Sequence, residues 1–224
     1  MTYNIIATGS SGNAVVIDDY ILIDCGVPFK SLAPVIGNIK LVLLTHIHKD
    51  HFNPSTAAAI HRRRPTVRFG CCEWMVRPLL DAGVSKRMID VYDFDSLYDY
   101  GQAGGYTVMP ERLTHNVPNC GYHISGPDGT VLFYATDTGT LDGVIAKDYD
   151  LYLIEANHTR AELESRAEEK QLSGAYAYEI EAAKNHLSRE QAEDWIYRNI
   201  GPKGRYAFLH GHIEEKGAAQ IGYG

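Results

Sequence analysis

The sequence predicts an α/β protein of four layers, with two β-sheets inside and helices on both outer faces. Three observations lead to this fold class. Strand patterns, a helix, more strands, further helices and a last strand follow one another along 224 residues. The segment KLVLLT (40–45) is continuously apolar, which is typical of a strand buried on both faces. A composition with 45% hydrophobic and 22% charged residues can fill a substantial core. With no repeat or linker visible, we expect one domain over 1–224.

The N-terminal half is expected to alternate short strands with helices. Turn-forming residues, GSSGN and Asp18–Asp19, separate the first apolar runs, and Asn53–Pro54 is typical of a helix start. Strands are therefore predicted over 3–8, 14–17, 20–24, 40–45 and 66–70, and helices over 54–63 and 73–82.

The C-terminal half is expected to begin with a meander of antiparallel strands between 89 and 136, where Gly and Pro punctuate strand-like runs. A strand at 150–156 ends in Glu155, and 161–186 is predicted to form one or two polar helices. Ser188 and Gln191 have the spacing of a capping box, which predicts a helix over 189–199. The last strand is predicted over 205–210.

Composition excludes several function classes. No apolar run is long enough to span a bilayer, and the N-terminus lacks the pattern of a secretion signal, so we expect a cytoplasmic protein with no membrane partner. The formal net charge of −7 disfavours a protein that coats duplex DNA through a broad basic face. The four cysteines have no CxxC spacing and predict neither a zinc knuckle nor disulfides.

A cluster of metal-binding side chains follows the buried strand at 40–45. His46, His48, Asp50 and His51 occur within six residues. Imidazole nitrogen and carboxylate oxygen suit Zn²⁺, Mn²⁺ or Fe²⁺, and four such groups would be costly to bury without a ligand. The segment therefore predicts a metal site.

The same segment resembles the second motif of the metallo-β-lactamase fold superfamily. The other family motifs appear in order along nearly the whole chain: Asp24 in LIDCG, His115 in LTHNVPNCGY, Asp137 in LFYATDTG and His210 in YAFLHGH. The resemblance implies the αβ/βα sandwich of that superfamily. His212 is an alternative to His210, which we favour because it closes the strand pattern.

The resemblance implies two divalent ions, Zn²⁺ or Mn²⁺, that share one carboxylate. One ion would take His46, His48 and His115. The other would take Asp50, His51 and His210, with Asp137 between the two ions. A hydroxide held by the metals would be the nucleophile. Asp50 is assigned to the catalytic residues as well as to the metal ligands. Asp24 is expected to orient the loop histidines rather than to bind a metal.

The first motif region, GSSGNA, and the run IEANHTRAEL…AAKNHLSREQAEDW resemble the YycJ-type (WalJ) exonucleases of this superfamily, and more distantly the tRNA 3′-processing endonucleases. That branch implies Glu155 and His186 as a pair in which the histidine protonates the leaving oxygen, and it implies a substrate-binding role for His158. It also implies a homodimer. The bridging Asp137 disfavours a class B1 β-lactamase, which would have Cys there.

Two substrate classes remain open, because compact phage anti-Pycsar phosphodiesterases resemble the same branch. The substrate is either a nucleic acid or a cyclic nucleotide. The basic run Arg62–Arg64 and Arg68 could contact phosphate, although a solvated helix end is the simpler interpretation.

Two other functions are alternatives. A thioester or lactone hydrolase of glyoxalase-II or lactonase type would carry the same metal motif but have less need of Glu155 and His186, since a thiolate leaves without protonation. A metal-stabilised binding module without catalysis is disfavoured, because every expected type of ligand is present.

Overall fold

The computed structural model describes residues 1–101, 104–163, 165 and 184–211. It contains two six-stranded sheets. The first holds six strands in sequential order: β1 (Tyr3–Ala7), β2 (Ala14–Ile17), β3 (Ile21–Ile23), β4 (Leu41–Leu44), β5 (Arg68–Cys72) and β6 (Ile89–Tyr92). The second has the order β12-β11-β10-β9-β8-β7, formed by β7 (Tyr98–Tyr100), β8 (Tyr106–Leu113), β9 (Asn119–Ser125), β10 (Val131–Ala135), β11 (Leu151–Glu155) and β12 (Arg205–Leu209).

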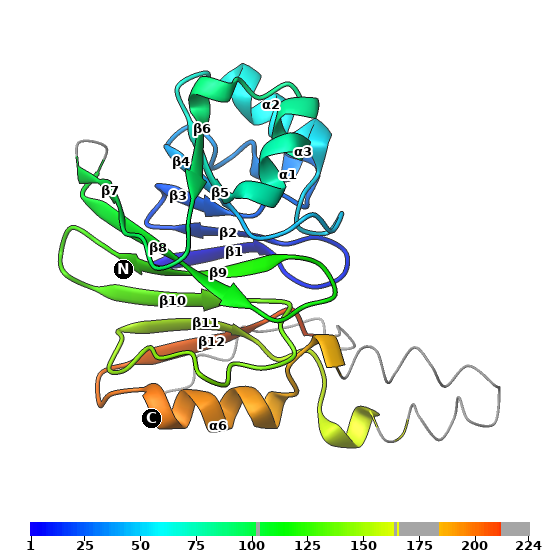
Figure 1. Ribbon diagram of the computed structural model, residues 1–224, viewed down its shortest axis with the longest axis vertical. Helices are drawn as coiled ribbons and strands as arrows, with labels where there is room; N and C mark the ends of the chain where they lie inside the picture. Colours follow the sequence, from blue (N-terminus) through cyan, green and yellow to red (C-terminus); the bar gives the residue numbers. More distant parts are fainter. Residues whose placement is uncertain (102–103, 164, 166–183, 212–224) are drawn as a thin grey trace.

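Helices cover the outer face of each sheet, as Figure 1 shows. On the first sheet lie α1 (Phe29–Leu32), α2 (Pro54–Arg63) and α3 (Val76–Asp81), with 3₁₀ turns at Glu73–Met75 and Lys86–Met88. The second sheet is covered by α6 (Arg189–Asn199). The predicted four-layer α/β fold is confirmed.

The core consists of three apolar layers, and strand periodicity sorts residues between them. In β4, Val42 and Leu44 pack towards the helices, while Leu41 and Leu43 pack between the sheets. In β10, Phe133 packs against the α6 side. Because both faces of these strands are buried, their sequences are continuously apolar rather than alternating.

The termini of two helices follow their sequence signals. Helix α2 begins at Pro54, and the Asn53 side chain accepts a hydrogen bond from the Thr56 amide. The capping box of α6 forms between Ser188 and Gln191. Both helices have the predicted bounds, 54–63 and 189–199.

Three differences from the predictions involve short elements. The strand at Ile89–Tyr92 is not part of the antiparallel meander: it pairs in parallel with β5 as the edge of the first sheet, because α3 provides the crossover that parallel pairing needs. The helix predicted over 73–82 is divided into a 3₁₀ turn and α3. The single-turn helix α1 was not predicted.

Of the helices predicted over 161–186, the part at 166–183 lies outside the described residues, as does His212. None of the helices in the described part of the chain combines the length and apolar character that crossing a bilayer requires.

Candidate metal centre

The site lies where strands of both sheets end at a common edge. In the first sheet, Asp24 follows β3, and His46 comes two residues after β4, which is parallel to β3. In the second sheet β10, β11 and β12 are parallel, and their ends carry Asp137, Glu155 and His210. Parallel strands bring their carboxyl ends together, and this is why residues so distant in sequence meet.

A close approach of two backbones shapes this edge. The Cys25 amide donates to the His51 carbonyl, and a Cβ added at Gly26 would collide with the Asp50 carbonyl. Only glycine lets the two segments come this near.

Three residues of the site have left-handed backbone conformations that are uncommon outside glycine. Asp24, Asp137 and His210 have φ of 61°, 57° and 53°. Asp and His tolerate this region better than most residues, and such conformations concentrate at functional sites.

The first group of metal-type atoms surrounds His48. Its Nδ1 lies 3.1 Å from His46 Nε2 and 3.2 Å from His115 Nε2. Burial and the neighbouring imidazoles lower the pKa of His46 well below its ordinary value. Burial also lowers the pKa of His115, to about 4. Neutral imidazoles present lone pairs, so the group is suited to a cation.

The second group joins Asp50, His51 and His210. Asp50 Oδ2 lies 3.4 Å from His210 Nε2 and 3.7 Å from His51 Nε2. Burial alone would raise the pKa of Asp50, but the contacts with His210 and His51 together outweigh burial and hold the pKa below its ordinary value. Asp50 thus offers an ionised carboxylate.

Asp137 lies between the two groups, with one oxygen towards each. Its Oδ1 is 3.2 Å from His51 Nε2 and 3.4 Å from His210 Nε2. Its Oδ2 is 3.6 Å from His46 Nε2 and 3.8 Å from His115 Nε2. Burial opposes ionisation, yet these imidazoles keep the pKa of Asp137 well below its ordinary value.

The donor atoms are of the kinds that bind divalent cations. His46, His48, His115 and Asp137 form one group that could hold an ion, and Asp50, His51, His210 and Asp137 form another. Asp137 Oδ1 is buried and has no hydrogen-bond partner. A buried carboxylate oxygen without a donor is costly, and a shared cation would remove that cost. All seven ligands predicted from sequence are thus brought together.

Asp24 contacts both ends of the segment 45–51, which carries four of the predicted metal ligands. Its Oδ2 is 2.7 Å from His51 Nδ1, and its Oδ1 accepts from the Thr45 amide at 2.9 Å. Burial opposes a charged His51, but Asp137 and Asp24 raise its pKa well above the ordinary value. The predicted orienting role of Asp24 stays a prediction, and the contact with His51 is where it would act.

Replacing Asp24 with Asn is expected to weaken metal binding by about 10–100-fold, the usual cost of losing a group that orients a metal ligand. Asn keeps the left-handed backbone but cannot accept hydrogen bonds with both side-chain atoms. Titration with a competing chelator measures the affinity. An unchanged metal affinity in a folded variant would contradict the role.

Glu155 and His186 form a pair beside the second group. His186 Nδ1 lies 3.0 Å from Glu155 Oε2, and the His186 ring stacks on His210 with centroids 5.2 Å apart. Glu155 is fully buried and its Oε1 accepts from the Thr138 and Leu187 amides. Burial disfavours charge on His186, but the hydrogen bond and the negative charge of Glu155, together with the charge of Asp137, outweigh burial and raise the pKa of His186.

His158 is not in either metal group. It is 6% exposed, and its Nδ1 lies 3.4 Å from Asn157 Oδ1. Asn157 Nδ2 in turn lies 3.2 Å from His210 Nδ1. The substrate-binding role of His158 stays a prediction.

Asn13 is a site residue that the motif analysis did not assign. Its Nδ2 lies 2.8 Å from His51 Nε2 and 3.4 Å from Asp50 Oδ2, and it also donates to the Asp50 carbonyl. A polar residue that ends the glycine-rich turn GSSGN was the available signal.

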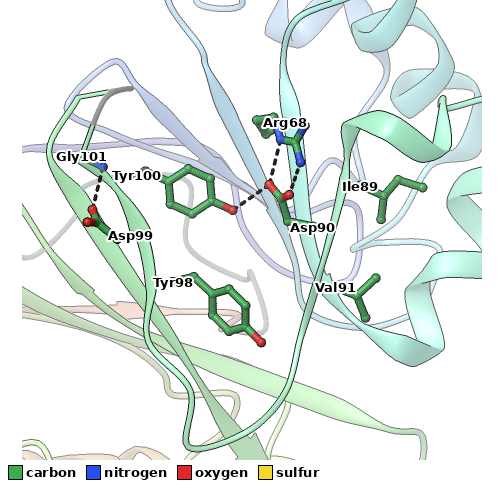
Figure 2. Close-up of a pocket in the computed structure, with 8 residues that line it drawn as sticks. All are labelled: Arg68, Ile89, Asp90, Val91, Tyr98, Asp99, Tyr100 and Gly101. Atoms are coloured by element: carbon green, nitrogen blue, oxygen red, sulfur yellow. Dashed lines mark hydrogen bonds and ion pairs between the residues drawn. The ribbon is translucent and has the colours of Figure 1, made fainter.

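The basic run formed by Arg62–Arg64 and Arg68 does not gather at the metal edge of the sheets. Arg68 is paired with Asp90, which also accepts from the Tyr100 hydroxyl at 2.9 Å (Figure 2). These residues line a cavity of about 780 Å³ between the edge strands β6 and β7. Arg68 begins β5, at the opposite end of the sheet from His46, so the run lies away from the metal groups.

Comparisons with known proteins identify the family of the chain and its fold. The family profile described as "Beta-lactamase superfamily domain" matches residues 19–210. A comparison with curated protein sequences finds no match.

Solved structures share the fold at low sequence identity. The metallo-β-lactamase fold protein YhfI from Bacillus subtilis has a TM-score of 0.70 and 15% identity, covering 95% of this chain and 87% of its own. A diphosphatase of the PhnP family has a TM-score of 0.64 and 14% identity, with 93% and 85% covered. A long form RNase Z from yeast has a TM-score of 0.61 and 12% identity; the match covers 98% of this chain but 38% of that one.

Proposed function

Because the chain belongs to the β-lactamase superfamily, we propose that it is a metal-dependent phosphodiesterase that hydrolyses a nucleic acid or a cyclic nucleotide. The observation that carries the proposal is the contact of His186 with Glu155 directly beside the metal-type groups. An alkoxide leaving group needs an acid, and a thiolate does not. Phosphodiester cleavage therefore explains this pair better than thioester hydrolysis.

The metal ligands of the proposal are His46, His48, His115, Asp50, His51 and His210, with Asp137 shared. Two divalent ions, Zn²⁺ or Mn²⁺, would supply charge neutralisation at the scissile phosphate and would activate water. The two-sided position of Asp137 supports the sharing.

In this proposal His186 supplies the proton for the leaving oxygen, and Glu155 holds the histidine ring. His186 Nδ1 donates to Glu155 Oε2, which fixes the tautomer and orients the ring. In the imidazolium form His186 then donates its Nε2 proton to the leaving oxygen. Glu155 is itself fixed by two backbone amides, so the pair is held in place before substrate binds.

A hydrolysis assay with Mn²⁺ and with Zn²⁺ tests the proposal. The substrates are 5′-labelled single-stranded DNA, a small RNA, 3′,5′-cyclic CMP, UMP, AMP and GMP, and a glutathione thioester. We expect phosphodiester hydrolysis that a chelator abolishes and either metal restores. Turnover of the thioester alone would overturn the proposal in favour of a glyoxalase-II-like enzyme. The homodimer, the single domain and the cytoplasmic location stay predictions.

A further inference from the structure

A small cavity opens beside the first metal-type group. It has a volume of about 290 Å³, and its lining includes Trp74, Arg112, His115 and Asn119. This is near the lower end of the roughly 300–1,000 Å³ that small-molecule sites occupy. Since His115 also belongs to the first metal-type group, a ligand in the cavity would lie beside that group.

Trp74 is placed at the cavity by the fold. It lies in the 3₁₀ turn directly after β5, and β5 is the parallel neighbour of β4, so the turn emerges at the metal edge. Its Nε1 donates to the Thr45 carbonyl at 3.1 Å. Thr45 immediately precedes His46, so the indole is anchored to the loop that holds the metal ligands.

A cation lies at the same cavity. The Arg112 guanidinium is 4.1 Å from the centroid of Phe94, whose ring lies 6.0 Å from that of Trp74. In the described part of the chain the recorded partner of Arg112 is this ring and not a carboxylate. Its N–H groups remain available for acceptor atoms of a ligand.

Asn119 also belongs to the wall of this cavity. Asn119 is buried, and its Nδ2 donates to the carbonyls of Thr136 and Asp137. Its Oδ1 has no hydrogen-bond partner and is itself buried, so a ligand in the cavity does not reach it. The cavity thus combines a flat aromatic side chain with the donors of Arg112.

We propose that this cavity binds the nucleobase of the nucleotide whose phosphate lies at the metal centre, with the base against Trp74 and an acceptor atom of the base, a carbonyl oxygen or a ring nitrogen, towards Arg112. The inference rests on the proposed function and adds the place where the base of its substrate binds. Stacking on an aromatic side chain tolerates every base, because each has a π-face. A base-independent phosphodiesterase would need no such cavity.

Two esters with the same leaving group test the proposal in the metal-loaded enzyme. One is thymidine 5′-(p-nitrophenyl) phosphate, and the other is methyl p-nitrophenyl phosphate, which has no base. Trp74→Leu is expected to raise KM for the thymidine ester about tenfold, the effect of losing one stacked base, with KM for the methyl ester unchanged. Arg112→Ala is expected to raise the same KM, whereas Arg63→Ala, at an exposed arginine of α2, leaves both unchanged.

Trp74→Phe separates stacking from anchoring, because Phe keeps an aromatic face and loses the hydrogen bond to Thr45. We expect it to retain most of the affinity that Trp74→Leu loses. The proposal would be overturned if Trp74→Phe and Trp74→Leu raised KM for the thymidine ester equally. It would also be overturned if Trp74→Leu changed KM for both esters to the same extent.

Tryptophan fluorescence gives a readout that does not need turnover. The chain has two tryptophans, and the other, Trp195, is buried. Thymidine monophosphate should quench the emission of the native protein but not that of Trp74→Phe. If quenching occurs while neither ester is hydrolysed, the proposed function fails and the base site stands. If both esters are hydrolysed without quenching, the base site fails.

Discussion

Replacing Asp137 with Asn is expected to abolish measurable turnover and to release bound metal, while the protein stays folded. Asp137 is 2% exposed and directs one oxygen towards each group of metal-type atoms. Losing its charge leaves both groups without their common carboxylate. Metal catalysis contributes several kcal/mol, so the rate should fall at least about a thousandfold.

The substitution is chosen so that the backbone is not disturbed. Asp137 has a left-handed backbone, which Asn tolerates. Asp148→Asn is the matched control, since Asp148 is also left-handed but precedes β11, at the end away from the metals. Metal content by elemental analysis and kcat on a phosphodiester are the measurements. An Asp137→Asn protein that keeps both metals and its activity would show that the carboxylate is not shared.

Replacing His186 with Ala is expected to lower kcat by about 10²–10⁴ on a substrate with an alkoxide leaving group, because the leaving oxygen loses its acid. The effect should be small on a p-nitrophenyl ester, whose leaving group needs no proton. Metal content should remain that of the native protein, because all seven proposed metal ligands are intact. Glu155→Gln should lower kcat on the same alkoxide substrate by a smaller factor.

The pH profile distinguishes this role from a structural one. His186 acts only when protonated, and its raised pKa keeps it protonated to higher pH than an ordinary histidine. In the native enzyme kcat on the alkoxide substrate should fall as pH rises through that pKa. This alkaline fall should disappear in His186→Ala and persist in His61→Ala, at the end of α2. Full activity of His186→Ala on the alkoxide substrate would refute the assignment.

Local sequence signals were sufficient for most elements. Asn53–Pro54 and the Ser188–Gln191 capping box each depend on atoms within one helical turn, and both helices have the predicted bounds. The continuous apolar run at 40–45 indicated a strand buried on both faces, as β4 is. The partner sheet of Ile89–Tyr92 was not determined locally, because pairing depends on which strand edge is available after the chain has collapsed.

The sequence by itself determined which metal-type side chains to look for. The spacing of His46, His48, Asp50 and His51 places four such side chains on one turn, and the resemblance to the family's motif order indicated Asp137 and His210.

Only the tertiary structure decided which other side chains share the site. Asn13 contacts the His51 ring from 38 positions away, and Trp74 is anchored 29 positions from Thr45. Ordinary core tryptophans and turn asparagines have the same local sequence appearance. The difference lies in the parallel strand ends that bring β4, β5 and β10–β12 to one edge, and contacts of that kind are set by packing between sheets rather than by neighbours along the chain.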